Sequence, residues 1–206
     1  MIDELTPLQQ ARREKILNAA LSIFSTVGYY KAEMSVIAQE SEVGKGTLYR
    51  YFKNKEDLFL QTVENQTNQL YEYIFHKIKP IEDPKEFLNQ FFENIVNYCS
   101  ENSKSFDILY LSSSSMLNKA SKIIDRVRKS YAEKLSDRFV NWKEKGLIHS
   151  VNKDIVIDIT SFCMFFLMYE FHYRKNFSIQ EIKENMTRLF SFGLLSRKYY
   201  QEEGLA

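Results

Sequence analysis

Helix-start and helix-stop signals recur along nearly the whole chain of 206 residues, and they constrain its fold more than any other feature. Thr6 precedes Pro7 and stands three residues before Gln9, which is the pattern of a capping box with proline at the first helical position. Ser178 and Glu181 form a second capping box near the other end. No stretch alternates between apolar and polar residues for long enough to indicate a strand. The sequence therefore predicts an all-α protein of about nine helices.

Apolar residues spaced three and four apart, together with Gly and Pro, mark the limits of these helices. The first begins at Pro7 and is closed by Gly28, and a long one begins at Ser121 and is ended by Gly146. The serine-rich region 103–118 is expected to hold one short helix and a loop. The remaining expected helices cover 34–41, 45–52, 54–79, a stretch that starts at 83, 152–171 and 178–200.

Composition excludes several classes of protein. The chain has 28 Lys and Arg against 27 Asp and Glu, a net charge of +1, so it is neither a basic nucleic-acid tail nor a disordered segment. Cys99 and Cys163 form no C-x-x-C pair, which fits a reducing compartment. The most apolar stretch, 155–173, is interrupted by charges, and the start lacks the features of a signal peptide. We expect a cytoplasmic protein that does not enter a membrane.

Patterns that accompany catalysis or metal binding are missing from the sequence. The three histidines, His76, His149 and His172, are far apart, and no H-E-x-x-H, G-x-S-x-G, P-loop or G-x-G-x-x-G is present. We therefore expect no enzyme activity, no cofactor and no metal site.

The segment from Met34 to Lys55 carries the most specific pattern in the chain. Its two short expected helices are separated by the turn 41–44, Ser-Glu-Val-Gly. Ile37 on the first helix can meet Leu48 and Phe52 on the second, so both helices can share a small core with the helix that precedes them. This is the layout of a helix-turn-helix, in which the second helix enters the major groove of DNA.

Opposite Leu48 and Phe52, the second helix presents cations, hydroxyls and a glycine. Between Gly44 and Lys55 there are four Lys or Arg residues and no acid. Cations bind phosphates, while Lys, Thr and Tyr can also contact base edges. Gly46 removes a side chain at the helix start, so backbone N–H groups can approach a phosphate. The pattern predicts a DNA-binding surface; the alternative is a protein-interaction module whose basic corner binds an acidic partner and no DNA.

A longer pattern of residues surrounds this segment. It comprises Arg13, Ile16, Leu17, Ala19, Ala20, Phe24, Gly28 and Tyr29, then Ile37 and Ala38, then the run VGKGTLYRYFKNKEDL over 43–58. This pattern resembles the signature of the tetracycline-repressor (TetR) family of transcriptional regulators. The remainder of the chain is similar to that family in its size and its helical pattern.

The resemblance implies a homodimeric regulator of transcription, usually a repressor, that leaves a palindromic double-stranded DNA operator when a small effector binds. It implies a DNA-binding domain over 1–55, continued by a linking helix over 54–79, and a ligand-binding and dimerisation domain over 80–206. Lys55 would hold a phosphate, and Ser35 stands where relatives can reach a base. With Arg50 from the cationic face, the expected DNA-binding residues are Ser35, Lys45, Gly46, Thr47, Tyr49, Arg50, Tyr51 and Lys55.

Three residues depart from the family pattern. Glu33 stands where the family often has a threonine that caps the second helix. Glu42 stands where the turn usually has glycine, and Gly44 where it usually has serine. The turn geometry is therefore expected to differ, whereas the cationic face is retained.

The helix expected over 152–171 is apolar on nearly every side, so every side must be buried. One side can face its own domain and the other a second copy of the chain. Together with the last helix it would form a four-helix dimer interface, and a two-fold axis suits DNA half-sites. Gly193 would allow a close helix crossing; the alternative is a glycine that is merely tolerated in the middle of the helix. The expected interface residues are Ile159, Met164, Ile182, Met186, Leu189, Phe190 and Gly193.

Aromatic residues make up 15% of the chain, which is enough to line an apolar cavity as well as a core. We expect this cavity to bind a small hydrophobic effector, although helical stripes of rings are also typical of packed core. The candidate lining consists of Phe91, Phe92, Ile95, Tyr98, Phe106, Tyr110, Val127, Tyr131, Phe162, Phe166 and Tyr169.

Overall fold

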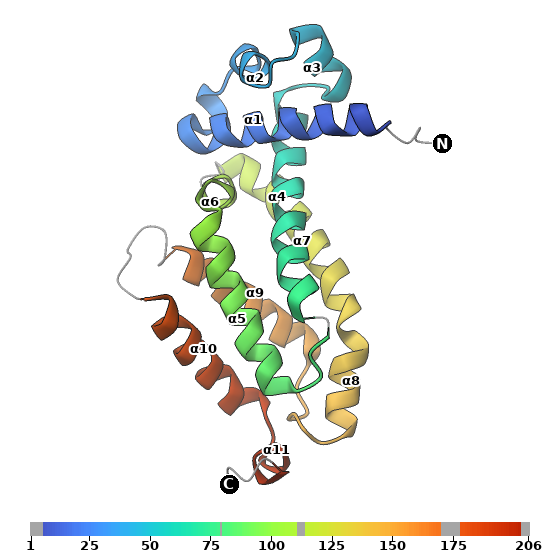
Figure 1. Ribbon diagram of the computed structural model, residues 1–206, viewed down its shortest axis with the longest axis vertical. Helices are drawn as coiled ribbons and strands as arrows, with labels where there is room; N and C mark the ends of the chain where they lie inside the picture. The colour runs from blue at the N-terminus through green and yellow to red at the C-terminus, as the bar shows by residue number, and fades with distance from the viewer. Residues whose placement is uncertain (1–5, 79, 111–113, 170–177, 203–206) are drawn as a thin grey trace. The chain divides into compact units, whose positions relative to one another are not determined.

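The computed structural model describes residues 6–78, 80–110, 114–169 and 178–202, and within these ranges the chain is helical (Figure 1). The one pairing of extended residues there is an isolated bridge between Ile148 and Leu195. The all-α prediction is therefore confirmed. The helices are α1 (Pro7–Lys31), α2 (Met34–Glu40), α3 (Lys45–Tyr51), α4 (Lys55–Ile78), α5 (Pro84–Glu101), α6 (Ser103–Tyr110), α7 (Ser114–Lys134), α8 (Ser136–Glu144), α9 (Lys153–Tyr169), α10 (Ile179–Leu194) and α11 (Arg197–Glu202).

The chain forms two compact units. The first unit combines Met1–Gln69 with Lys104–Val127, and the second combines Leu70–Ser103 with Arg128–Ala206. Helices α4 and α7 therefore each contribute residues to both units. The domains expected from the sequence, 1–55 and 80–206, are continuous segments, whereas each unit is built from two.

Both predicted capping boxes are present. The Thr6 side chain accepts from the backbone N–H of Gln9 and the Gln9 side chain accepts from that of Thr6, and Ser178 and Glu181 do the same for α10. Gly28 has φ 77°, ψ 167°, so it breaks the regular helix as predicted, although one further helical turn follows it before α1 ends. Helix starts are thus well encoded in the local sequence.

Two predicted helices are each divided in two, which raises the number of described helices to eleven. The helix expected over 121–145 starts at Ser114 and is interrupted by a turn at Leu135, between α7 and α8. The last expected helix is interrupted at Leu195, which is extended because it pairs with Ile148. The backbone N–H of Ser196 donates to the carbonyl of Leu147 at 2.9 Å in the same pairing. Neither interruption contains Gly or Pro.

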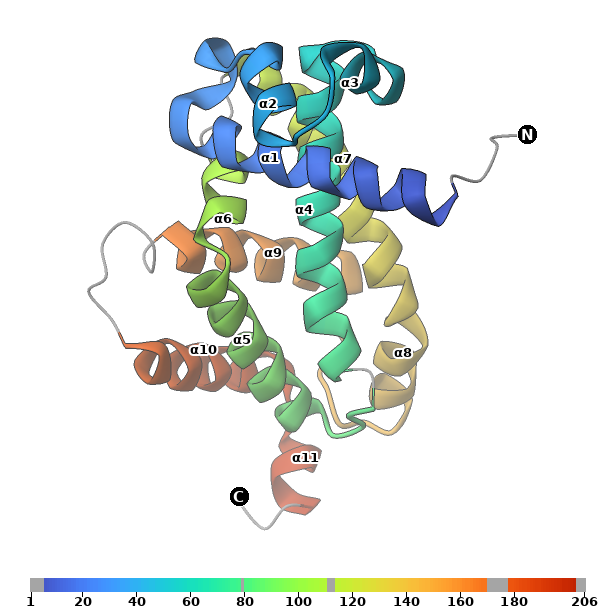
Figure 2. The same ribbon diagram turned by 45° about the horizontal axis from the view of Figure 1, so that its top comes forward.

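In the first unit, α1 packs against α2, α3 and the first half of α4. Ile16, Ile37 and Leu48 are fully buried, and the ring of Phe24 meets that of Phe59 edge to face at 5.1 Å between centroids. Helices α2 and α3 lie on the same side of α1 (Figure 2). The small core predicted for the N-terminal helices is therefore present.

In the second unit, α5 lies beside α10 in both views (Figures 1 and 2). The Phe92 and Phe190 rings connect these helices at 5.1 Å between centroids. Trp142 of α8 is buried, and its Nε1 donates to the carbonyl of Glu82 at 2.6 Å. In the described part of the chain, none of the helices combines the length and the hydropathy that a bilayer span requires.

Candidate functional site

The turn between α2 and α3 fixes the angle at which α3 is presented. Ser41 is fully buried, and its hydroxyl donates to the carbonyl of Ile37 at 2.7 Å. The backbone N–H groups of Glu42 and Val43 donate to Gln39 and Ala38 at 3.0 Å each. These bonds satisfy the carbonyls at the end of α2, so the corner is held mainly by local backbone interactions.

Glu42 adopts a left-handed conformation with φ 52°. Among the described residues it is the one non-glycine with positive φ, and a side chain makes this conformation unfavourable. This geometry explains why the position suits glycine, the residue expected there from the resemblance. The Glu42 carboxylate pairs with the ammonium of Lys15 on α1, and that pairing lowers the pKa of Glu42.

Helix α3 has one buried face and one exposed face. Leu48 and Phe52 are fully buried against α1 and α2. On the opposite side Lys45, Gly46, Tyr49 and Arg50 are exposed, while Thr47 and Tyr51 are half-buried at the margins. The helix therefore offers two cations, a phenol and an open backbone position to a partner, as the sequence pattern predicts.

The remaining predicted contacts, Ser35 and Lys55, already have partners within the first unit. The Ser35 hydroxyl donates to the Glu33 carboxylate at 3.2 Å, and Glu33 makes no side-chain capping bond to α2. The Lys55 ammonium donates to the carbonyls of Tyr30 and Ala32 at 3.1 and 3.0 Å. Lys55 therefore closes the C-terminal end of α1, a role that the sequence did not indicate.

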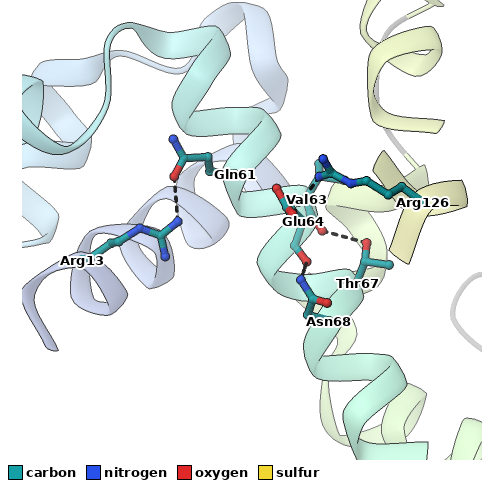
Figure 3. A network of polar contacts seen from close by, with 7 residues as sticks. All are labelled: Arg13, Gln61, Val63, Glu64, Thr67, Asn68 and Arg126. Carbon is teal, nitrogen blue, oxygen red and sulfur yellow. Dashed lines mark hydrogen bonds and ion pairs between the residues drawn. The ribbon is translucent and has the colours of Figure 1, made fainter. Parts of the chain in front are cut away.

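A polar network joins α1 to the start of α4 (Figure 3). Arg13 donates from Nη2 to Oε1 of Gln61 at 2.7 Å, and Gln61 donates from Nε2 to Oδ1 of Asp57 at 2.8 Å. The other carboxylate oxygen of Asp57 accepts from the backbone N–H of Lys53, just after α3. Arg13 and Asp57 thus fix the segment between α3 and α4 relative to α1.

Ion pairs attach α7 to α4 within the same unit. Arg126 donates to Glu64 at 2.8 Å, as Figure 3 shows, and Lys119 pairs with Glu56. On α6, Lys104 donates to the hydroxyl of Ser22 at 3.1 Å. The sequence did not indicate these contacts, since partners more than 60 positions apart leave no local pattern.

Comparison with known proteins agrees with this arrangement. The family model of bacterial regulatory proteins, TetR family, matches residues 16–62, which contain the whole corner and α3. Over these residues the chain is similar to the TetR family. The resemblance drawn from residues 13–58 is thereby confirmed.

Curated TetR-type relatives match the same part of the chain. The HTH-type transcriptional regulator HbdR of Aromatoleum sp. (strain CIB) is 35% identical over 81 residues, which is 39% of this chain and 35% of that protein. The fatty acid metabolism regulator protein of Bacillus subtilis (strain 168) is 35% identical over 74 residues, 36% of this chain and 38% of that protein. The chain thus spans less than two fifths of the length of either relative.

Solved structures match nearly the whole chain in fold. The fatty acid degradation regulator FadR from Bacillus halodurans has a TM-score of 0.75 at 19% identity, covering 91% of this chain and 96% of that one. FadR from Bacillus subtilis in complex with stearoyl-CoA has a TM-score of 0.71 at 19% identity, covering 85% and 96%. The TetR-type fold therefore extends well beyond the segment that matches in sequence.

The second unit contains an apolar cavity, which we call the chamber. The volume within it that the centre of a water molecule can occupy is about 60 Å³. Aromatic and aliphatic side chains form nearly all of its wall. The lining residues are Tyr71, Phe75, Phe87, Leu88, Phe91, Arg128, Ala132, Leu135, Phe139, Val156, Thr160, Phe190 and Leu194.

Only part of the predicted pocket lining reaches the chamber. Phe91 lines it, whereas Phe92, Ile95 and Tyr98 are buried in the packing around α5. Val127 is buried in the first unit, and Tyr169 is half-buried outside the described lining. The side chains of Phe106 and Tyr110 lie outside the described part of the chain.

The pocket prediction is wrong for Phe162 and Phe166. Their side chains are 74% and 54% exposed, so neither lines the chamber. Helix α9 is apolar all round, and periodicity cannot decide which of its apolar faces turns inward. Here Val156 and Thr160 face the chamber, while the face of Phe162 and Phe166 points to solvent.

The predicted interface residues also divide between two environments. Ile159, Leu189 and Gly193 are exposed, as an interface requires. Ile182 is buried and Phe190 lines the chamber, so those two predictions are wrong, while Met186 is half-buried and the Met164 side chain is not described. The predicted interface set lacked four exposed apolar residues on the same helices, namely Ile155, Phe162, Phe166 and Phe192.

A second, more polar cleft, which we call the vestibule, lies between α4 and the α7–α8 region. It is lined by Glu72, Phe75, His76, Tyr131, Lys134, Leu135 and Arg138. The Tyr131 hydroxyl donates to the carboxylate of Glu72 at 2.9 Å. Burial, with that acceptor, raises the pKa of Tyr131 to about 12, so its hydroxyl is protonated at neutral pH. Tyr131, predicted for the pocket, thus belongs to this cleft.

Proposed function

We propose that this chain is a DNA-binding transcription regulator, a repressor that acts as a homodimer and leaves its operator when a small apolar effector binds in the chamber. One observation carries the DNA-binding part of this proposal. Leu48 and Phe52 hold α3 in the core, and this leaves Lys45, Tyr49 and Arg50 exposed on its other face. A second copy related by a two-fold axis would present the same face to the other half of a palindrome.

The chemistry of the α3 face suits duplex DNA. Lys45 and Arg50 can neutralise phosphates, and both Arg and Lys can also bind the acceptor edge of guanine in the major groove. Gly46 leaves the backbone at the N-terminal end of α3 accessible, since even a methyl group at that position would have no neighbouring heavy atom within 4 Å. Thr47 and Tyr49 add hydroxyls beside these cations. Ser35 could join the contact surface if its hydroxyl turned from Glu33 to DNA.

The proposed effector site rests on the chamber and on the relatives. The FadR structure from Bacillus subtilis holds stearoyl-CoA, a molecule with a long apolar chain. The chamber of this chain has an almost wholly apolar wall. Apolar walls with few polar groups are typical of sites that bind small organic molecules. We infer a hydrophobic effector for this chain on these two grounds.

A dimer would cover the exposed apolar residues of the second unit. On α9, Ile155, Ile159, Phe162 and Phe166 recur at a helical spacing and are each more than half exposed. On α10, Leu189 and Phe192 are about two-thirds exposed. Water-exposed apolar groups in such numbers favour association, so we assign both faces to contact with a second copy.

Effector binding would reach DNA through the two helices that belong to both units. Tyr71 and Phe75 of α4 line the chamber, and Gln61 earlier in the same helix bonds to Arg13. On α7, Ala132 lines the chamber and Arg126 pairs with Glu64. The effector can change DNA affinity only by binding one conformation of these helices more tightly than another.

An electrophoretic mobility shift with the DNA upstream of the chain's own gene tests this function. We expect a specific, salt-sensitive complex that the variant Tyr49→Ala weakens. The alternative function, a protein-interaction module with a basic corner, predicts no complex with any duplex. A result of that kind, obtained with protein that is folded by circular dichroism, would overturn the proposal.

A further inference from the structure

The chamber and the vestibule share a wall. Phe75 of α4 and Leu135, between α7 and α8, line both. An apolar volume and a polar cleft therefore meet at two side chains within the second unit. A single ligand could have one part on each side of them.

Besides Tyr71, the chamber wall contains two polar side chains, Arg128 and Thr160, and both have partners within the chain. The chamber therefore offers few polar groups to a ligand. Arg128 pairs with the carboxylate of Asp158. The Thr160 hydroxyl donates to the carbonyl of Val156 in its own helix at 2.6 Å. An anionic group placed inside the chamber would have to compete with Asp158 for Arg128, whereas an apolar group loses nothing there.

The vestibule, in contrast, offers cations. Lys134 is exposed, and its ammonium lies over the Tyr131 ring at 3.9 Å from the centroid. No carboxylate of the described residues forms an ion pair with Lys134. Arg138 donates to the carbonyl of Ile78 at 3.0 Å and lies 3.8 Å from Glu82, so its charge is partly compensated.

The remaining titratable groups of the vestibule do not cancel this charge at Lys134. Glu72 is exposed and accepts from the Tyr131 hydroxyl. His76 is exposed beside it on the same face of α4. Among the lining residues Lys134 and Arg138 carry positive charge and Glu72 carries negative charge, so the lining itself has one net positive charge.

We propose that the effector of this chain is an amphipathic anion, with an apolar chain in the chamber and an anionic head held by Lys134 in the vestibule. This rests on the proposed function insofar as the chamber is the effector site, and it adds the chemical class of the effector. Any group with a fixed negative charge can serve as the head, since Lys134 acts as a point charge.

The single tryptophan gives a direct readout of the chamber. Trp142 lies 5.2 Å from Phe87 and 5.3 Å from Phe139 between ring centroids, and both phenylalanines line the chamber. A ligand that displaces water or moves these rings should change the emission of Trp142. Binding can therefore be followed on the full chain without DNA, which separates this test from the test of DNA binding.

The experiment titrates the chain with decanoate, 1-decanol and decyltrimethylammonium, which share one apolar chain and differ in the charge of the head. We expect decanoate to bind most tightly and the cation least. The variant Lys134→Gln should weaken decanoate binding by about threefold to tenfold and leave 1-decanol unchanged, because only the anion contacts that charge. Lys134→Arg should keep the preference, and Lys122→Gln, which removes an exposed cation elsewhere on α7, should change nothing.

The variant Ala132→Phe locates the apolar part of the ligand. It fills space at the chamber wall, so all three compounds should lose affinity in a chain that still unfolds cooperatively. Equal binding of decanoate and 1-decanol, or no effect of Lys134→Gln on decanoate, would refute the anionic head while leaving an apolar effector in place. If none of the three compounds binds the unaltered chain, both the amphipathic effector and the chamber as its site are overturned. This conclusion would hold whether or not the chain binds DNA.

Discussion

Leu48 and Tyr49 are neighbours in α3, yet the Leu48 side chain is fully buried and that of Tyr49 is 45% exposed. The two residues therefore mark the boundary between the part of α3 that holds the fold and the part that is available to a partner. Each side chain can be truncated separately. Truncation of Leu48 should mainly lower stability, whereas truncation of Tyr49 should mainly weaken DNA binding.

Leu48→Ala should lower the free energy of unfolding by about 2–5 kcal/mol, because it leaves a cavity in the small core of the first unit. Tyr49→Ala should change that free energy by no more than about 0.5 kcal/mol, since Tyr49 is nearly half exposed and lies on the face of α3 opposite Leu48 and Phe52. The same Tyr49→Ala should weaken DNA binding by about tenfold through loss of contacts in the groove. Urea unfolding and fluorescence anisotropy with a labelled duplex measure the two effects. If Tyr49→Ala unfolds as readily as Leu48→Ala, Tyr49 belongs to the core.

The left-handed turn residue gives a prediction about stability. Glu42→Gly should raise the free energy of unfolding by about 0.5–1 kcal/mol, because relief of an unfavourable φ exceeds the added entropy of glycine in the unfolded chain. The lost pair with Lys15 is exposed and contributes little. Glu42→Ala is the matched control: it removes the same pair but keeps the strain, so it should bring no gain. Equal stability of the Gly and Ala variants in thermal unfolding would exclude strain at this turn.

Lys55 gives a prediction about the stability of the C-terminal end of α1. Lys55→Gln should lower the free energy of unfolding by about 1 kcal/mol, because the ammonium no longer satisfies the carbonyls of Tyr30 and Ala32. Lys53→Gln, which removes a nearby exposed cation, should leave stability unchanged. Chemical denaturation of both variants tests this directly. Indistinguishable midpoints would mean that Lys55 does not stabilise the end of α1.

The dimer assignment predicts the effect of charge on α9. Phe162→Glu should shift the chain from dimer to monomer in light scattering coupled to size-exclusion chromatography, because a buried carboxylate opposes association. Val140→Glu, at another exposed apolar residue on α8, should leave the dimer intact. A monomeric unaltered chain, or a dimer that tolerates Phe162→Glu, would contradict this interface.

Local signals explain why much of the fold was predictable. Thr6, Ser178 and Gly28 act through their own backbone or that of close neighbours, and each does in the structure what its sequence pattern indicates. The buried pair Leu48 and Phe52 followed in the same way from helical spacing. Such features depend on residues only a few positions apart.

Features that depend on distant residues could not be predicted. The interruption at Leu195 comes from its pairing with Ile148, and the partners of Lys55 are carbonyls more than 20 positions away. The exposure of Phe162 reflects which side of α9 met the rest of the second unit. In each case the decisive contact leaves no pattern in the adjacent sequence.

The most direct measurement is the salt dependence of binding to the duplex upstream of the chain's own gene. Two copies of α3 carry Lys45 and Arg50, so about four phosphate contacts should give a slope of log affinity against log salt near −4. Lys45→Ala should make that slope shallower by about two for a dimer, and Lys143→Ala, an exposed lysine of α8, should not alter it. A specific complex with these slopes supports α3 as the DNA-reading helix. Affinity that does not change with salt, or no complex with any duplex tested, would contradict it.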